Sequence, residues 1–371
     1  MAKVIGICNL HNEPPLGEIT ENRPLGTVSF LGRYGLMDFT LSNFSNSGIN
    51  IMPILVEKYN DLVRSHIRDG SIWINNTKIG FIRLFMNEKV LNNAAFNTDV
   101  NNIIANKFVL KSIECDYVLI ASPHFLYSFN FNEMVDAIED SDIDILCLYS
   151  HRQDADKDFI NSDSFIIEGT KIVGSRKNSG RNRDADIGLS AYLFKPAALE
   201  KLIDESRDIS ELYTLRDLVN HAIHNKSMNI HGYEFKGYVL PILSLQDYVD
   251  KSFELLNYEN RQKLFLDDWP IYTTSHNTPP AMYMEGASVK NSFIANGSII
   301  NGKVENSILS RDVIVEEGAE VKNCIIFTHA NVGAKVKLKY VLADKHSSIK
   351  EVKRLSGEKE EILVVTQGAK I

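Results

Sequence analysis

The stretch RPLGTVSFLGRYGLMDFTLSNFSNSGI, residues 23–49, decides the fold that we expect for this chain. It follows an apolar run at residues 3–8, which is typical of a buried parallel strand. Between the two lies a loop at residues 9–20 with the sequence NLHNEPPLGEIT. Ligands of α/β proteins bind outside the carboxyl ends of parallel strands, so this loop is the first place to look for a site.

The same stretch resembles the beginning of the ADP-glucose pyrophosphorylases, also called glucose-1-phosphate adenylyltransferases. Their pattern here is R-A-K-P-A-V-P-F-G-G-K-Y-R-L-I-D-F-x-L-S-N-x-x-N-S-G-I, and the match from Asp38 to Ile49 is long and specific. A lone glycine motif would be much weaker evidence. The resemblance continues through a connector, WPIYTTSHNTPPA at residues 269–281, and covers nearly the whole chain.

The loop at residues 9–20 departs from that family where a nucleoside triphosphate is held. The family pattern is G-G-G-x-G-T-R-L-x-P-L-T, in which glycines let backbone N–H groups approach phosphates and an arginine neutralises them. Glu13 falls on a glycine, Pro15 on the arginine, and Leu25 on the lysine of R-A-K-P. Proline removes a backbone donor and a carboxylate repels phosphate. The resemblance therefore implies that the chain keeps the family's fold but that this loop no longer binds a nucleoside triphosphate.

Two aspartates that hold Mg²⁺ in the family are replaced as well. Mg²⁺ needs hard oxygen ligands, which the family supplies from the ends of two strands. The pattern L-S-G-D-H-x-Y corresponds to IASPHFLY at residues 120–127, with His124 at the aspartate. The pattern W-x-D-V-G-T corresponds to GYVLPILS at residues 237–244, with Pro241 at the second aspartate. We expect no metal site and no cofactor in this chain, and Mg²⁺ only in a catalytic partner.

Composition is that of an ordinary globular protein. The chain has 371 residues, 44% hydrophobic and 24% charged, a length that suits two domains. Its net charge of −8 argues against nucleic acid or an anionic membrane surface as a partner. The four cysteines are far apart in apolar surroundings, and neither a signal peptide nor an 18-residue apolar run is present. We therefore expect reduced thiols and a cytoplasmic protein.

Strand-like and helix-like patterns alternate from residue 51 to 240, which predicts a Rossmann-like α/β domain with a mainly parallel sheet. Helices are expected at residues 60–68, 101–113 and 248–256, from Lys195-Pro196 onward, and after Ser210 as an N-cap. We expect the nucleotidyltransferase-like domain to span residues 1–250, a connector 251–286, and a last domain 287–371.

The last 85 residues contain an internal repeat. VKNSFI begins at Val289, VENSIL at Val304, VKNCII at Val321, and a fainter VKLKYV at Val336. The starts are 15, 17 and 15 residues apart, close to one coil of three hexapeptides. Aliphatic residues facing inward and asparagines at corners are typical of a left-handed parallel β-helix. The apolar segment at residues 361–366 is expected either to cap this domain or to contact another subunit.

Arg33 and a basic run at residues 176–183 are the candidate anion-binding positions. Arg33 matches the lysine of F-G-G-K-Y-R, so the resemblance implies an effector site for a small anionic metabolite, which arginine can bind through two N–H groups. Two basic residues of the family's anion site are missing, because Gly35 and Met282 stand in their places. Arg176 and Lys177 resemble a remnant of the family's sugar-phosphate motif E-K-P, although such charge runs are more often solvated loops.

The resemblance, with losses at the triphosphate and metal positions, implies a largely inactive regulatory subunit of bacterial glucose-1-phosphate adenylyltransferase in glycogen biosynthesis. It implies a catalytic partner in a hetero-tetramer, with a homo-oligomer as the alternative. Three other functions stay open: an active nucleotidyltransferase whose metal site has moved to Asp38 or Asp99, a free-standing sugar-phosphate sensor, and an acyltransferase that uses His329. Composition and spacing alone give only a two-domain protein with a nucleotidyltransferase-like fold.

Overall fold

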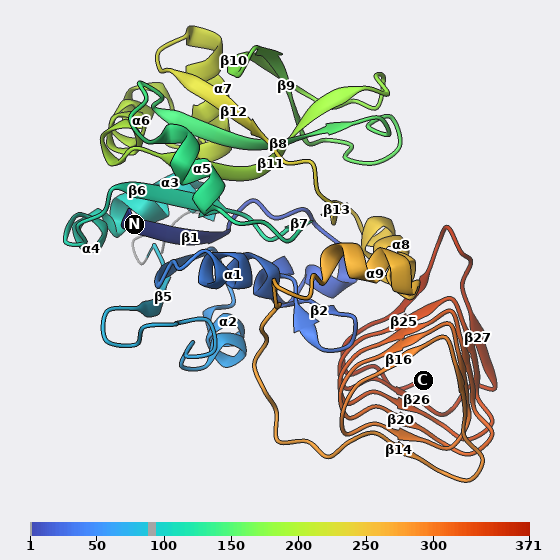
Figure 1. The fold of residues 1–371 in the computed structure, drawn as a ribbon. Helices are drawn as coiled ribbons and strands as arrows, with labels where there is room; N and C mark the ends of the chain where they lie inside the picture. The colour runs from blue at the N-terminus through green and yellow to red at the C-terminus, as the bar shows by residue number, and fades with distance from the viewer. Residues whose placement is uncertain (1, 88–93) are drawn as a thin grey trace. The chain divides into compact units, whose positions relative to one another are not determined.

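The computed structural model describes residues 2–87 and 94–371, which fold into two compact units. The first unit comprises residues 1–14, 37–243 and 265–272, and the second comprises residues 15–36, 244–264 and 273–371. Figure 1 labels the elements of both units. The boundaries expected at residues 250 and 286 stay a prediction, and these units differ from them because residues 15–36 belong with the C-terminal repeats.

The first unit is built around a mixed sheet of nine strands among the described residues, in the order β5–β4–β1–β6–β11–β8–β12–β10–β9. Strands β5, β4, β1 and β6 run parallel to one another, and β8 runs parallel to β12. Strand β11 is antiparallel to β6, β8 and β9, and β10 is antiparallel to β9 and β12. The α/β fold class is confirmed. The strands are β1 Val4–Leu10, β4 Ile51–Val56, β5 Phe81–Phe85, β6 Tyr117–Ala121, β8 Ile145–Arg152, β9 Asp163–Glu168, β10 Lys171–Lys177, β11 Ala185–Phe194 and β12 Ile230–Glu234.

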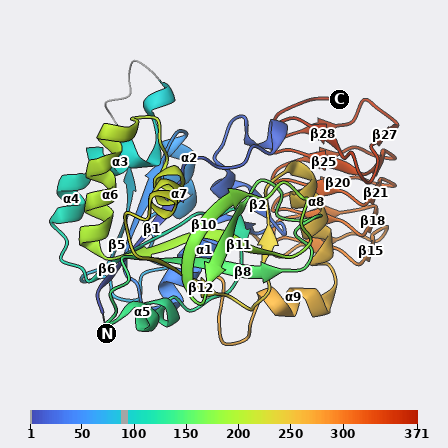
Figure 2. The ribbon, with the colours of Figure 1, turned by 90° about the horizontal axis from the view of Figure 1, so that it is seen from above.

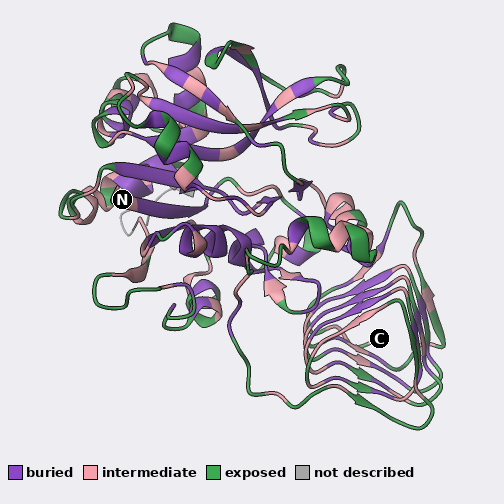
Figure 3. Ribbon diagram, viewed as in Figure 1, coloured by how far each residue is buried: buried purple, intermediate pink, exposed green. Residues whose placement is uncertain are grey.

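Helices cover both faces of this sheet, as Figures 1 and 2 show. Residues 5 and 7 of β1 enter one core and residues 8 and 10 enter the other, so the strand is buried on both faces, as its apolar run predicts. Figure 3 shows this burial along the central strands. One core is covered by α1 (Met37–Asn46), α2 (Asn60–Ile67) and α5 (Asn132–Ile138), and the other by α3 (Asp99–Ala105), α6 (Pro196–Ile209) and α7 (Leu215–Asn225).

Strand β1 lies where the order of the sheet reverses. Strand β4 pairs with it on one side and β6 on the other. In open α/β sheets the ligand crevice lies outside the carboxyl ends of the strands at such a switch point. The loop that begins at His11 follows β1, and His124 comes shortly after β6, so the topology brings both to this edge.

One helix prediction is wrong in extent. The helix expected at residues 101–113 is two helices, α3 and α4 (Lys107–Lys111), with a break at Asn106. Asn106 has a ψ of 7°, and its side-chain amide donates to Met86 O (3.1 Å) and Asn102 O (2.9 Å). An asparagine side chain that bonds nearby backbone carbonyls in this way competes with helix continuation.

The N-cap expected at Ser210 is also wrong, because α7 is capped by Thr214. Thr214 Oγ1 accepts from the backbone N of Asp217, whose carboxylate accepts from the backbone N of Thr214. This reciprocal capping box satisfies two backbone donors at the start of the helix. The other expected helices are confirmed: α2 at Asn60–Ile67, α6 beginning at Pro196, and α8 at Leu245–Glu254. Among the described residues, no helix combines the length and apolarity needed to span a membrane.

The C-terminal repeats form the predicted parallel β-helix, in which three sheets of five strands enclose an aliphatic core. The first sheet contains β14 Met282–Tyr283, β17 Ile299–Ile300, β20 Ile314–Val315, β23 Asn331–Val332 and β26 Ser348–Ile349. The second contains β15 Ser288–Lys290, β18 Lys303–Glu305, β21 Glu320–Lys322, β24 Lys337–Lys339 and β27 Arg354–Ser356. The third contains β16 Phe293–Ile294, β19 Ile308–Leu309, β22 Ile325–Ile326, β25 Val341–Ala343 and β28 Leu363–Val365.

Asparagines stack at one corner of this β-helix, as the repeats predict. Asn291, Asn306 and Asn323 have φ values of 45°, 48° and 52°, a left-handed conformation that asparagine tolerates better than most residues. The side-chain amide of Asn291 donates to Asn306 (2.8 Å), and that of Asn306 donates to Asn323 (2.7 Å). The same residue type therefore serves both the turn and the contact between coils.

A buried ion pair joins residues 15–36 to the last coils of the β-helix. Arg23 donates to both carboxylate oxygens of Asp344 at 2.7 and 2.9 Å, and to Gln367 at 2.7 Å. The side chains of Arg23 and Asp344 are 3% and 2% exposed. Removing one partner of such a pair would leave a buried charge without compensation, which costs roughly 3–5 kcal/mol. The pair therefore holds this early segment of the chain in the second unit.

The apolar segment at residues 361–366 is used within its own domain. It contains β28, which pairs with β25, and Val365 there is 2% exposed. The chain then returns to β26, where Ser348 N donates to Ala369 O (2.7 Å) and Lys350 N to Ile371 O (2.6 Å). The C-terminal end of the β-helix is thus closed by the chain itself.

Candidate functional site

The loop after β1 is held down by a buried histidine. His11 is 2% exposed, and its backbone N donates to Asn9 Oδ1 (3.0 Å). Its ring nitrogens lie 3.2 Å from Asn97 O and 3.0 Å from Asn102 Nδ2, which fits a neutral ring that donates from Nδ1 and accepts at Nε2. Burial lowers the pKa of His11 to about 4. The side chain of His11 is therefore bonded inside the first unit and holds this loop in place.

Asp99 joins this loop to two helices. Its carboxylate, 2% exposed, accepts from Asn9 Nδ2 (2.8 Å), from Val100 N (2.9 Å) and from Leu215 N (2.9 Å). Asp99 and Leu215 are the first residues of α3 and α7, so the carboxylate lies at two helix N-termini, where negative charge is stabilised. Burial raises the pKa of Asp99, and these hydrogen bonds oppose the shift.

The structure brings together the two positions that correspond to the family's metal ligands. Pro241 lies in β13 (Leu240–Pro241), which pairs antiparallel with β7 (Phe125–Leu126), and Ile242 N donates to His124 O (2.8 Å). His124 Nε2 lies 3.1 Å from Ser190 Oγ, and its buried Nδ1 has no hydrogen-bond partner among the described residues. Burial, with the positive charge of Arg216, lowers the pKa of His124 to about 3.

These residues do not fit a magnesium ion. Mg²⁺ is bound by carboxylate, carbonyl and water oxygens in a near-octahedral arrangement. At the first position stands the imidazole of His124, near the guanidinium of Arg216. At the second stands Pro241, whose side chain has no atom that can bind a metal. Across residues 2–87 and 94–371, no group of three or more His, Cys, Asp or Glu side chains is arranged to hold a metal ion. The donor set therefore disagrees with the family's metal chemistry.

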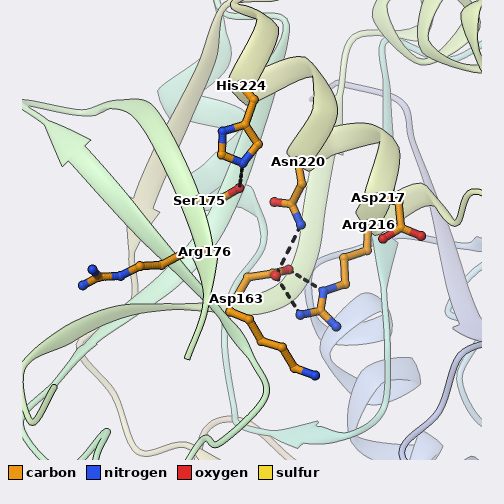
Figure 4. A pocket seen from close by; sticks show the side chains of 8 residues that line it. Asp163, Ser175, Arg176, Arg216, Asp217, Asn220 and His224 are labelled. Carbon is orange, nitrogen blue, oxygen red and sulfur yellow. Dashed lines mark hydrogen bonds and ion pairs between the residues drawn. The ribbon is translucent and has the colours of Figure 1, made fainter. Parts of the chain in front are cut away.

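A pocket of about 370 Å³ lies between β9, β10 and α7, and Figure 4 shows its side chains. Arg216 Nε and Nη2 donate to the two carboxylate oxygens of Asp163 at 2.6 and 2.7 Å, and Asn220 Nδ2 lies 3.3 Å from Asp163 Oδ1. Asp163 is 8% exposed and Arg216 is 43% exposed. Figure 4 also shows Arg176 pointing away from this pair. The charge of the buried Asp163 carboxylate is thus compensated by Arg216, which lines the same pocket.

Two of the predicted phosphate-binding residues line this pocket. Arg176 and Lys177, at the end of β10, are both exposed. Ser175 Oγ, on the same strand, lies 3.3 Å from His224 Nε2. Neither Arg216 nor Asp163 can be found from the sequence, because the two are far apart in the chain and no motif connects them. The one available signal was the position of Arg216 inside the capping box of α7.

The remaining predicted site residues are divided between the units. Glu13, His124, Pro241, Arg176 and Lys177 belong to the first unit, whereas Pro15, Leu25 and Arg33 belong to the second. Leu25 is 1% exposed, and Arg33 is exposed with its guanidinium carbon 5.9 Å from the centroid of the Tyr34 ring.

The carboxylates suggested for a displaced metal site already have partners. Asp38 is fully buried, and its Oδ1 lies 2.6 Å from His66 Nε2. The Asp99 carboxylate accepts hydrogen bonds from Asn9, Val100 and Leu215. In the repeats, His329 lies against His346 with ring centroids 5.1 Å apart, and its Nδ1 is 3.8 Å from an Asp312 oxygen.

Two protein families match separate parts of this chain. The nucleotidyl transferase family matches residues 16–158, and the family described as GlmU-like, C-terminal hexapeptide matches residues 279–361. The chain thus combines a nucleotidyltransferase-type domain with hexapeptide repeats, in the order that the fold shows.

Curated relatives are similar to this chain over most of its length. Glucose-1-phosphate adenylyltransferase from Clostridium perfringens (strain SM101 / Type A) is 26% identical over 324 residues, which cover 85% of this chain and 82% of that protein. The protein of the same name from Thermosipho melanesiensis is 28% identical over 83% of this chain and 74% of its own length. The glucose-1-phosphate adenylyltransferase from Bacillus thuringiensis (strain Al Hakam) is 25% identical over 362 residues, which cover 95% of this chain and 95% of that protein. Over most of its length this chain is therefore similar to glucose-1-phosphate adenylyltransferases, also called ADP-glucose pyrophosphorylases.

The burial of His11 predicts an acid sensitivity of the first unit. The ring has a pKa of about 4 when folded and about 6.5 when unfolded, so between these values the unfolded chain binds more protons. The free energy of unfolding should therefore fall as the pH drops from 6.5 to 4. His11→Gln should flatten that dependence by up to about 1.4 kcal/mol per pH unit. Both tryptophans belong to the first unit, so urea denaturation followed by their fluorescence measures it.

The matched control is His276→Gln, which replaces an exposed histidine of the second unit. It should leave the pH dependence of the tryptophan signal unchanged. If His11→Gln and the wild-type chain lose stability equally on acidification, His11 does not carry the effect.

Proposed function

We propose that this chain is a regulatory subunit of glucose-1-phosphate adenylyltransferase, without significant activity of its own, that modulates a catalytic partner in glycogen biosynthesis. The reaction of that enzyme joins ATP and glucose 1-phosphate to give ADP-glucose and pyrophosphate. The observation that carries the proposal is the pair formed by His124 and Pro241. They are adjacent at the expected ligand edge of the sheet, and neither can replace a carboxylate on Mg²⁺.

The closed loop after β1 supports the same proposal. A phosphate loop works through backbone N–H groups that point at the ligand. The backbone N of His11 instead donates to Asn9, and the ring occupies a pocket among Asn97 and Asn102. A buried, hydrogen-bonded side chain at this place stabilises the fold and competes with any triphosphate.

A subunit that has lost its chemistry can still act through assembly. It changes a neighbour's behaviour only if it binds the neighbour's weak and strong states unequally. We propose a hetero-tetramer with a catalytic adenylyltransferase subunit, in the cytoplasm, with Mg²⁺ bound only by the catalytic chain. The β-helix is the proposed main contact, because solenoid ends and edges are common association surfaces.

The kinetic test uses the purified chain alone and then mixed with a catalytic subunit from the same cell. Alone, it should show no magnesium-dependent rate near the roughly 1–10³ s⁻¹ of ordinary enzymes. His124→Asp, and His124→Asp with Pro241→Asp, should stay inactive because the loop after β1 remains closed. In the mixture, the catalytic subunit's apparent substrate affinity or effector response should shift by roughly 5–150-fold.

A robust rate from the isolated chain would favour the alternative, an active nucleotidyltransferase with a displaced metal site. Unchanged kinetics in the mixture, with the two proteins eluting separately on size exclusion, would contradict the regulatory function. Ligand binding without any effect on a catalytic subunit would instead indicate a free-standing sugar-phosphate sensor.

We also propose that the chain binds a small phosphorylated anion, at Arg33 or at the pocket beside Arg176 and Lys177. Arg33 is exposed, and Lys177 lies at the pocket that contains the Arg216–Asp163 pair. Calorimetry with orthophosphate, fructose bisphosphate and AMP should show saturable heat that is lost in Arg33→Gln or in Lys177→Gln. Lys171→Gln, an exposed lysine at the other end of β10, is the control and should bind normally. Absence of heat with all three anions would remove both sites.

A further inference from the structure

One corner of the β-helix places two histidines on neighbouring coils. This corner joins the third sheet to the first, and successive coils fill it with Gly297, Asp312, His329, His346 and Gly368. In each of the last four, the backbone N–H donates to the carbonyl group just before its counterpart on the preceding coil, at 2.9–3.2 Å. The five φ values lie between 58° and 78°, in the left-handed region, where glycine, aspartate and histidine are enriched. The register of the coils therefore sets His329 directly beside His346.

The two imidazoles form an exposed stack. Their ring centroids are 5.1 Å apart and their planes differ by 22°, so the rings lie nearly face to face. Both residues are exposed, and the side chain of His329 is 51% exposed. On the preceding coil, Asp312 Oδ2 lies 3.8 Å from His329 Nδ1. The corner thus aligns a carboxylate and two imidazoles along one edge of the β-helix.

These imidazoles differ from most others in the chain because they make no hydrogen bond. His66, His151 and His231 each have a ring nitrogen within 3.1 Å of a polar atom. Among residues 2–87 and 94–371, neither His329 nor His346 has such a partner. Nitrogen lone pairs on two adjacent rings are therefore available to a ligand from solvent.

The turn by itself does not require a pair of histidines. The corner between the second and third sheets contains asparagines, and the side-chain amide of Asn291 donates to Asn306 on the next coil. Asparagine thus accepts the left-handed conformation and also bonds to the next coil, whereas the histidines make no such bond. What the histidines add is two imidazole nitrogens side by side, which are typical ligands of transition metals.

The two cations that precede this corner in the chain have partners elsewhere. Arg311 Nη2 lies 3.5 Å from Thr274 O. Burial lowers the pKa of Lys345, followed in effect by the positive charge of Arg23, so the ammonium group lies toward that arginine. The carboxylate of Asp312 is the charge that contacts the histidine stack, and a carboxylate favours a cation beside it.

We propose that His329 and His346 together bind one divalent transition-metal ion, such as Zn²⁺ or Cu²⁺, with water completing its coordination. Imidazole nitrogens suit these metals, whereas Mg²⁺ prefers oxygen. A metal with bonds of about 2.0–2.1 Å to both rings holds the two nitrogens roughly 3 Å apart. Because both side chains are exposed, rotation about their side-chain bonds brings the ring edges together from the stacked arrangement. Asp312 faces Nδ1 of His329 and so leaves Nε2 of that ring for the metal.

The ion would join two coils of the β-helix next to a buried contact of the second unit. His346 follows Asp344, the partner of Arg23, by two residues. An ion that binds the folded chain and not the unfolded chain stabilises the folded chain. The expectation of no metal site rests on the carboxylate positions of the first unit, whereas this pair is brought together only by the register of the coils. The proposal does not depend on the regulatory function.

Calorimetric titration of the untagged full chain with ZnCl₂, in a buffer that does not bind metals, tests the site. The wild-type chain should have one tight site. His329→Asn or His346→Asn should raise the dissociation constant by at least about tenfold, because two linked ligands hold an ion far better than one. Asparagine suits the left-handed turn, so thermal unfolding without metal should be unchanged in both variants. The control is His151→Asn, which removes an exposed histidine beside Asp186 in the first unit and should bind zinc normally.

Electron paramagnetic resonance with one equivalent of Cu²⁺ identifies the ligands. The wild-type spectrum should show coupling to two imidazole nitrogens, and this spectrum should be lost in His329→Asn and in His346→Asn. A wild-type chain that binds neither ion would overturn the proposal, as would asparagine variants that bind zinc as tightly as the wild-type chain. Loss of the tight site in His151→Asn would also overturn it, because the ion would then belong to the first unit. Each outcome is independent of the kinetic test, which measures the effect on a catalytic subunit.

Discussion

The carboxylate of Asp99 is the interaction on which the first unit's ligand edge depends. It is buried, and it accepts hydrogen bonds from the side chain of Asn9 and from the first turns of α3 and α7. A buried charge is tolerated only when such donors compensate the loss of water. Because the donors come from three elements, the end of β1 and the starts of two helices are fixed relative to one another. The loop that follows is then closed by His11.

This constraint belongs to the fold and does not involve a ligand. The sheet order, the switch point at β1 and the β-helix are set by apolar periodicity and repeat spacing, which do not involve the ligand. At this edge polar side chains bond to one another. The ring of His11 contacts the side chain of Asn102, and Arg216 is paired with Asp163. Polar side chains that bond to one another stabilise the fold, and fewer of their donors and acceptors are then available to bind a substrate.

Much of the fold could be predicted from residues alone, and much of the site could not. The β-helix repeats and the burial of β1 have clear periods, so both predictions hold. The helix expected at residues 101–113 breaks because Asn106 bonds to backbone carbonyls, a contact that no apolar pattern reveals. His124 and Pro241 were placed by resemblance and are adjacent in the structure. The Arg216–Asp163 pair and the role of His11 depend on tertiary contacts between distant segments, which spacing cannot encode.

The central claim is that the loop after β1 is closed by its own hydrogen bonds and does not receive a nucleoside triphosphate. Deuterium uptake of the peptide covering residues 9–13, measured with and without saturating Mg·ATP, tests it most directly. A catalytic subunit from the same cell serves as the positive control, since a glycine-rich loop that binds triphosphate gains protection. For this chain the account predicts identical uptake in both conditions. Protection of residues 9–13 by Mg·ATP would contradict it.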